Sequence, residues 1–298
     1  MRVPHGAMSL PRRRGRTLLG AAVVLGLAAL VARETGCLAS PYPGGVVFQS
    51  DWSTDTGTSR RAVMDGGRWK QYWEFNDSGV QLLSVVPGGP GGRNALKVLQ
   101  RGVHFAAEVE QDNIVRPSTD FYVRFYMRND DTSLTGDHAV EPGLSAEYWS
   151  NLVYMRKFSS TSGWQFVNGM LGCGYTWPIA YWGPAATLAH GVWYRFEFWV
   201  HFVDPTHIEL HPRVYDASGA LRWSDKDFRQ SDFGSGVWNG RSDWTLASYY
   251  AARHSFCLDP TKIRGFAMGN NGQLEALDTG LAWYFAGVQI RTDWWPGP

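Results

Sequence analysis

The sequence predicts an all-β protein built as a two-sheet antiparallel sandwich. Three observations support this fold class: short runs alternate apolar and polar residues, Gly- and Pro-rich turns separate them, and helical runs do not alternate with strands. Aromatic residues make up 14% of the 298-residue chain and hydrophobic residues 44%, which is enough for a sizeable core. A net charge of +1 without a basic stripe argues against nucleic acid as a partner.

Residues 1–39 are predicted to be an export signal or membrane anchor. Four arginines between positions 12 and 16 precede an uncharged run at 17–32. This order is typical of an export leader, and the run approaches the roughly 20 residues of a membrane-spanning helix. We therefore expect an apolar leader helix that contacts the membrane, with the rest on the periplasmic or cell-surface side. Cleavage after Ala39, lipidation at Cys37 and retention of the leader stay open.

A Pro/Gly-rich linker is predicted at 40–45, and a single β-sandwich domain at 46–298. Export implies an oxidising compartment, where disulfides persist. Outside the leader the sequence contains two cysteines, Cys173 and Cys257. We consider a disulfide between them and a pair of buried free thiols as equal alternatives, because spacing alone does not determine the distance between their Cα atoms.

Strands are predicted in order along the domain. In the first half they are expected at 46–52, 80–86, 95–100, 103–110 and 121–128, with 95–100 and 103–110 forming a hairpin. In the run at 121–128, Phe, Val and Met alternate with Tyr and Arg. Further on, 151–158 and 164–167 are expected to pair, 172–183 to form a loop, and 243–254 to form a helix capped by Ser242. The runs at 262–268 and 281–291 are expected to close the sheet.

The clearest pattern lies at 191–215, where two alternating runs flank the turn-like residues 203–206. A period of two over eleven residues indicates a strand with one face in a core. Pairing the runs as an antiparallel hairpin would place both polar sets on one exposed face of a sheet. The polar set of the first run is Trp193, Arg195, Glu197, Trp199 and His201, and that of the second is His207, Glu209, His211, Arg213 and Tyr215.

The order of the strand segments resembles that of the concanavalin A-like lectin/glucanase superfamily, which includes laminin-G-like modules and polysaccharide lyases. The segments that carry the resemblance are F-x-S-D-W, ALKV, DFYVRFYMR, GVWYRFEFWV, IELHPRVYD, IRGFAMG and WYFAGVQI, between residues 46 and 291. The resemblance implies a jelly-roll sandwich with its ligand site on the concave sheet. It does not imply a function, because this architecture serves lectins, enzymes and inert modules alike.

The hypothesis that we favour is a non-catalytic binding or structural module. Exposed Trp, Tyr and Arg side chains stack on sugars and also anchor protein interfaces. The partner would be a glycan or a larger membrane protein complex of which this chain is an extrinsic subunit. Alternatively, the insertion at 217–260 covers the face with its own aromatic residues. The ligand-binding candidates are Trp193, Arg195, Glu197, Trp199, His201, His211, Arg213, Tyr215, Tyr122, Arg124 and Tyr126.

The alternative hypothesis is a polysaccharide lyase or glycoside hydrolase. β-Elimination at a uronic acid needs a base, a cation that neutralises the carboxylate, and an acid for the leaving oxygen. The candidates are His201, His207 or His211 as base, Arg195 or Arg213 as cation, and Tyr215 or Tyr122 as acid. The motifs of alginate lyases are absent from the sequence. A hydrolase would need two nearby carboxyl groups, for which Glu108 and Glu110 are the nearest match.

A metal site is a weaker expectation. His207, Glu209 and His211 lie at alternate positions of one predicted strand and carry the side-chain types that zinc prefers. Alternate residues are about 6.6–7 Å apart along a strand, so three of them reach one ion only with difficulty. Asp-rich loops could hold calcium, and no other cofactor is expected.

Overall fold

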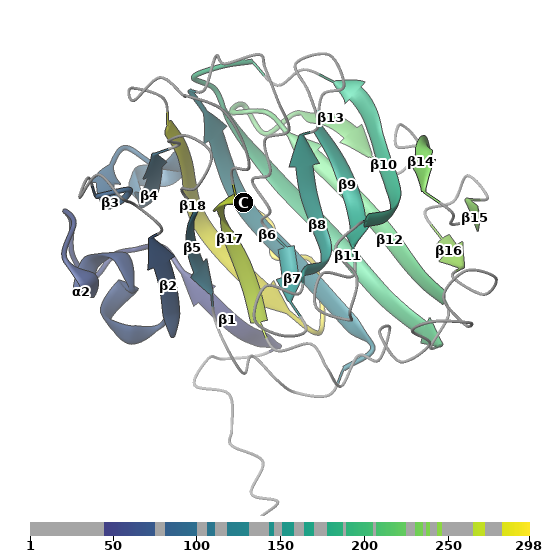
Figure 1. Ribbon diagram of the computed structural model, residues 1–298, viewed down its shortest axis with the longest axis horizontal. Helices are drawn as coiled ribbons and strands as arrows, with labels where there is room; N and C mark the ends of the chain where they lie inside the picture. The colour runs from purple at the N-terminus through teal and green to yellow at the C-terminus, as the bar shows by residue number, and fades with distance from the viewer. Residues whose placement is uncertain are drawn as a thin grey trace, which may run out of the picture. The chain divides into compact units, whose positions relative to one another are not determined.

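The computed structural model describes residues 45–74, 81–99, 106–110, 118–130, 143–145, 151–157, 164–169, 178–186, 189–204, 207–224, 230–234, 237–238, 243–245, 265–271 and 282–298. Two antiparallel sheets form its sandwich (Figure 1), which confirms the predicted fold class. The leader at 1–39, Cys173 and Cys257 lie outside these residues. In the described part of the chain, no helix has the length and apolar character needed to cross a membrane.

Sheet A contains the predicted hairpin near its middle. Its strand order is β15 (Val237–Trp238), β16 (Asp243–Thr245), β12 (His207–Tyr215), β11 (Trp193–Asp204), β6 (Asp120–Asn129), β18 (Ala282–Arg291), β4 (Asn94–Leu99) and β3 (Leu83–Pro87). Strand β1 (Val46–Ser50) also pairs with β18, and β13 (Leu221–Ser224) also pairs with β12.

Sheet B faces sheet A and has the order β14 (Gln230–Gly234), β10 (Pro178–Ala186), β9 (Trp164–Gly169), β8 (Asn151–Lys157), β7 (Gly143–Ser145), β17 (Gly265–Asn271), β5 (Ala106–Glu110) and β2 (Gln71–Glu74). Helix α2 (Arg60–Val63) lies near β2 and β3 at one end of the sandwich, and β14, β15 and β16 lie at the other end (Figure 1). Short 3-10 turns at Asp65–Gly67 and Pro90–Gly92 complete the described elements.

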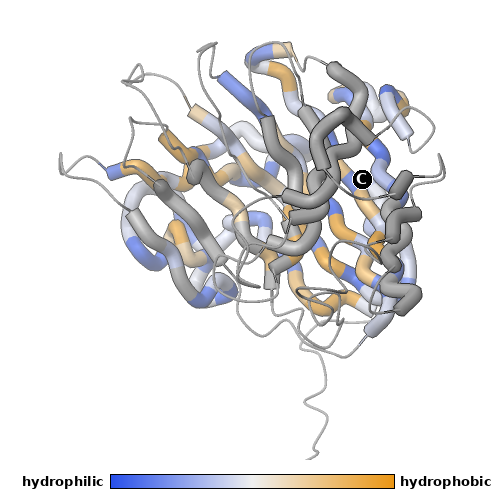
Figure 2. Tube along the Cα trace, turned by 45° about the vertical axis from the view of Figure 1, so that its right-hand side comes forward, coloured by the Kyte–Doolittle hydropathy of each residue, from blue (hydrophilic) through white to orange (hydrophobic). Residues whose placement is uncertain are grey.

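The alternation predicted for β6, β11 and β12 is confirmed. Trp193 to His201 of β11 pair with Arg128 to Asp120 of β6 without a break in register. On its other side β11 pairs with β12, and that register is continuous from Arg195 to Phe202. Figure 2 colours the chain by hydropathy, and hydrophobic and hydrophilic residues follow one another along its coloured strands. The apolar positions of all three strands lie on one face and the polar positions on the other.

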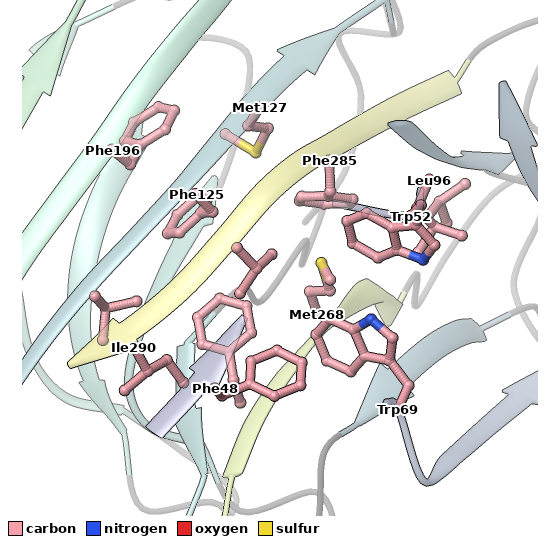
Figure 3. Packing of buried hydrophobic residues seen from close by; sticks show 14 of the residues in the cluster. Phe48, Trp52, Trp69, Leu96, Phe125, Met127, Phe196, Met268, Phe285 and Ile290 are labelled. Atoms are coloured by element: carbon pink, nitrogen blue, oxygen red, sulfur yellow. The ribbon is translucent and has the colours of Figure 1, made fainter. Parts of the chain in front are cut away.

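Aromatic side chains fill the space between the two sheets. Phe125 of β6 and Phe196 of β11 stack with ring centroids 5.2 Å apart, and Phe125 also contacts Phe266 of sheet B at 5.8 Å. At the N-terminal side of the core, Trp69 stacks on Trp52 at 5.6 Å (Figure 3). Both tryptophan side chains are fully buried, so the N–H group of each indole needs a hydrogen-bond partner. Trp69 Nε1 donates to Ser50 Oγ at 2.8 Å, for example.

The predicted hairpin between 95–100 and 103–110 is wrong. Strand β4 pairs with β3 and β18 in sheet A, whereas β5 pairs with β17 and β2 in sheet B. The alternating pattern identified both segments as strands but carries no information on their partners. In a sandwich the chain also crosses from one sheet to the other between consecutive strands. For the same reason, the segments at 262–268 and 281–291 do not close a common sheet, since β17 lies in sheet B and β18 in sheet A.

Two further predictions are wrong in their element type. The helix predicted at 243–254 begins instead with strand β16, in which Trp244 pairs with Ile208 of β12. Aromatic and β-branched residues favour strands, and the edge of β12 offers backbone partners that local helix signals do not reveal. The loop predicted at 172–183 includes the start of β10, which pairs with β9. By contrast, the predicted pairing of 151–158 with 164–167 is confirmed by β8 and β9.

Substitution of Phe125 with Ala should lower the free energy of unfolding by about 3–5 kcal/mol, because a ring held between both sheets would leave a cavity. Urea denaturation would measure this loss. The matched control is Leu221→Ala, since Leu221 is 53% exposed and its loss should cost no more than about 0.5 kcal/mol. Equal effects of the two substitutions would contradict the assignment of Phe125 to the core.

Candidate binding face

The polar side chains of β6, β11 and β12 lie together on the outer face of sheet A. The uninterrupted register arranges them in rows that run across the three strands. The pocket row is Tyr126, Arg195 and Tyr215; the ionic row is Arg124, Glu197 and Arg213; the aromatic row is Tyr122, Trp199 and His211. The structure thus brings together nine of the eleven candidate binding residues in these rows, and the other two, Trp193 and His201, lie on β11 at either end of them.

The centre of this face is not exposed, in contrast to the prediction. Glu197 is 2% exposed, Arg124 4% and Tyr122 9%. Charged side chains are rarely buried to this extent unless they are paired. The alternation in the sequence assigned these residues to the face opposite the core, and this is correct. The alternation could not reveal that another part of the chain lies over that face.

The covering segment is the C-terminal tail, residues 292–298. Arg124 Nη1 donates a hydrogen bond to the Gly297 carbonyl at 2.9 Å. The guanidinium of Arg213 lies 3.7 Å from the centroid of the Trp295 ring, within the range of a cation–π contact. Tyr122 contacts the rings of both Trp295 and Trp294, at 5.6 and 6.4 Å.

Sequence reasoning assigned no role to Trp294 and Trp295. The signal available was two adjacent tryptophans followed by Pro-Gly-Pro, directly after the last alternating run. The alternative in which residues 217–260 cover the face depends on aromatic side chains that lie outside the described residues or whose positions are not described. Among the described residues, the contacts over the ionic row come from the tail.

Glu197 is the buried carboxylate at the centre of the face. Burial raises the pKa of Glu197, and Arg195, Arg124 and Arg213 offset part of that rise by favouring its ionised form. The Nε atom of Arg195 lies 3.1 Å from Glu197 Oε1, but the contact does not have hydrogen-bond geometry. Burial likewise lowers the pKa of Arg124 to about 10. The ionic row is therefore a costly arrangement, in which neither sign of charge is well solvated.

A second polar cluster lies at the far end of the face. Asp120 Oδ1 accepts a hydrogen bond from Trp199 Nε1 and lies 2.9 Å from His201 Nδ1. Burial acts to raise the pKa of Asp120, but hydrogen bonds from Thr119, Trp199 and His201 hold that pKa below its ordinary value. The Trp199 ring stacks between Tyr122 at 5.7 Å and His211 at 4.6 Å. These contacts join the three rings of the aromatic row into one stack that runs across the strands.

A pocket of about 460 Å³ lies over the pocket row, at the opposite end of the face. Its floor is Tyr126, Trp193 and Arg195, and its walls come from the β3–β4 loop and the turn after β12. The loop contributes Arg93, whose guanidinium lies 5.6 Å from the Tyr126 ring centroid. The turn contributes Asp216. A hydrogen bond from Ser218 helps to lower the pKa of Asp216 to about 2. Arg222 lies 2.7 Å from the same carboxylate.

The remaining candidates are placed only in part. His207 and Glu209 belong to β12, but their side chains are not among those described, so the predicted site with His211 stays a prediction. No group of three or more metal-binding side chains occurs in the described part of the chain. Glu108 and Glu110 lie on β5 in sheet B, and therefore not on the face formed by β6, β11 and β12.

Replacing Glu197 with Gln should change how stability depends on pH. The pKa of Glu197 is raised in the folded protein above its ordinary value of 4.5, so folding takes up a proton in this range. The stability of the wild type should therefore fall, relative to the Gln variant, as pH rises from 4.5 towards neutral. Urea unfolding of both proteins at several pH values would measure this difference. Parallel stability profiles would show that the pKa of Glu197 is not raised.

No protein-family model matches the chain, and no curated protein matches its sequence. Solved structures do match. A PL-14 alginate lyase from Aplysia kurodai is 12% identical, with a TM-score of 0.53 over 84% of this chain and 100% of the lyase. Alginate lyase vAL-1 from Chlorella virus is 10% identical, with a TM-score of 0.42 over 80% and 98% of the two chains.

The catalytic domain of a glycoside hydrolase family 131 protein from Coprinopsis cinerea is 13% identical, with a TM-score of 0.40 over 85% of this chain and 99% of the domain. At such low identity the likeness concerns the fold and not the activity. The order of strand segments in the sequence predicted a two-sheet jelly-roll sandwich, and the sheet topology agrees with that prediction. This chain therefore has the same two-sheet jelly-roll sandwich fold as the Aplysia kurodai lyase.

Proposed function

We propose that the protein is a non-catalytic glycan-binding module that holds an acidic polysaccharide on the outer face of sheet A. The observation that carries this proposal is the pocket above Tyr126, Trp193 and Arg195. Its volume of about 460 Å³ lies within the range of roughly 300–1,000 Å³ that is usual for ligand pockets. The predicted leader at residues 1–39, in which arginines precede an uncharged run, supports an exported location for this module.

The chemistry of the pocket suits a sugar with a negative charge. The half-buried ring of Trp193 presents a flat apolar surface on which a sugar ring can stack, whereas Tyr126 beneath the pocket is buried. Arg93 and Arg195 bring two guanidinium groups, which bind carboxylates and sulfates in a bidentate manner. The carboxylate in the lining, Asp216, is already engaged by Arg222 and by its own turn, so it opposes an anion less than a free carboxylate would.

The distance of His201 from the pocket argues against catalysis there. Asp120 and His201 form a carboxylate–histidine contact that would orient His201 as a general base. However, His201 is six residues from Arg195 on the same strand, or about 20 Å at roughly 3.3 Å per residue. A base must lie within hydrogen-bond reach of the proton that it removes. Arg195 and His201 therefore do not act on the same bond.

Binding of polygalacturonate should weaken about tenfold or more on Arg195→Gln or Arg93→Gln, because a hydrogen bond to a charged group contributes about 1.5–3 kcal/mol. The Arg93 variant leaves the ionic row intact. Calorimetric titration would measure the affinity, with Arg61→Gln as the control, because Arg61 is exposed on α2 and outside the face. Equal affinity for polygalacturonate and an uncharged glucan would refute recognition by charge.

The rival function, a polysaccharide lyase, rests on the contact between Asp120 and His201. It requires that the protein release unsaturated uronate ends from polygalacturonate or alginate, with an accompanying rise in ultraviolet absorbance. We expect no such release by the wild type. Turnover that His201→Asn abolishes, while glycan affinity is retained, would replace the non-catalytic proposal with the lyase.

A further inference from the structure

The pocket on sheet A has a third wall, which is formed by the C-terminal tail. Two walls face each other across the strands: the β3–β4 loop contributes Gly88–Gly91 and Arg93, and the turn after β12 contributes Asp216–Gly219. Pro298 lines the pocket as well. The tail crosses the face at the ionic row, which is the next row along β11 from the pocket row.

The tail thus interrupts the outer face in the direction of the strands. The pocket row, the ionic row and the aromatic row succeed one another along β11, two residues apart. Without the tail they would form one continuous surface of aromatic and charged side chains. With the tail in place, Arg124 is bonded to the Gly297 carbonyl and Arg213 is stacked on Trp295. Arg124 and Glu197 are buried and Arg213 is half-buried, so the ionic row offers little surface to a ligand.

The tail is also attached at its start, independently of the face. The Thr292 backbone N–H donates to the Gly45 carbonyl at 2.9 Å, and the Gly45 N–H donates to Asp293 Oδ2 at 3.1 Å. Arg291 holds the same carboxylate through two bonds of 2.7 Å. The segment is therefore fixed both beside β1 and over the ionic row, which makes it a built wall of the pocket.

We infer that the tail closes one end of the pocket, so that the pocket receives the end of an acidic glycan chain and excludes internal segments. This inference rests on the proposed function. A chain that enters along β11 meets the two loops on either side and the tail ahead of it. An internal segment would have to continue past Gly297 and Trp295 across the ionic row, which the tail occupies.

The number of protein molecules bound per glycan chain tests this inference. Recognition of a chain end predicts one protein per chain at every length, whereas recognition of internal segments predicts a number that grows with length. The probes are size-fractionated oligogalacturonates and oligoalginates, each as a short and a long pool. Calorimetric titration with the full chain measures the ratio. A ratio that rises with length in the wild type would overturn the inference.

Deletion of Trp295–Pro298 should open the pocket and at least double the number of proteins bound to the long chains. A milder deletion of Gly297–Pro298 removes the bond to Arg124 and the wall at Pro298 but leaves Trp295 on Arg213, so it should raise the ratio above one by a smaller amount; it guards against misfolding of the larger deletion. The matched control is Trp294→Ala, because Trp294 is 67% exposed and does not line the pocket, so its ratio should stay at one.

The outcomes separate this inference from the proposed function. If both deletions bind long chains at an unchanged ratio of one, glycan binding stands but the tail is not the wall that selects chain ends. If neither the wild type nor the deletions bind any oligomer in either series, the proposed function fails, and the inference fails with it.

Discussion

The continuous register of β6, β11 and β12 is the constraint on which both the core and the face depend. Since side chains alternate across a strand, a slip of one residue would exchange Phe196 and Phe198 for Arg195 and Glu197 at the interface between the sheets. Stacking of Phe125 on Phe196 inside the sandwich is therefore linked to the pairing of Arg124 with Glu197 outside it. The same backbone hydrogen bonds set the composition of the core and the order of rows on the face.

One irregularity in sheet A serves that face directly. The register between β6 and β18 shifts between Ala286 and Gln289, and Gly287 within the shift has a φ of 54°. Its carbonyl accepts from Arg124 Nε at 3.1 Å, which satisfies part of a guanidinium that is almost fully buried. A side chain at this position would also approach the Tyr126 ring, since a Cβ would lie 3.1 Å from it. Glycine is therefore the residue that permits both the turn of the backbone and the close contact.

The sequence predicted those features that depend on alternation and failed where partners come from distant segments. The facing of Tyr122, Arg124 and Tyr126 away from the core followed from a period of two, and so did the central hairpin. The pairing of β5 in sheet B did not follow, because strand periodicity contains no information on neighbours. The burial of Glu197 was missed because the tail that lies on its arginine neighbours has no periodic pattern of its own.

The tail matters for the chemistry of the face because it lies on both arginines that flank Glu197 across the strands. Arg124 and Arg213 would favour ionisation of Glu197, yet burial has the larger effect and the pKa of Glu197 is raised. A buried ion pair repays the cost of desolvation only when its geometry is good, and the contact between Arg195 and Glu197 lacks hydrogen-bond geometry. Hydrophobic packing of similar volume would stabilise the centre of the face at lower cost. The chain instead has three arginines and a glutamate beside a pocket. Of these four residues Arg195 lines the pocket and can present its charge to a ligand, whereas Arg124 and Arg213 are held by the tail.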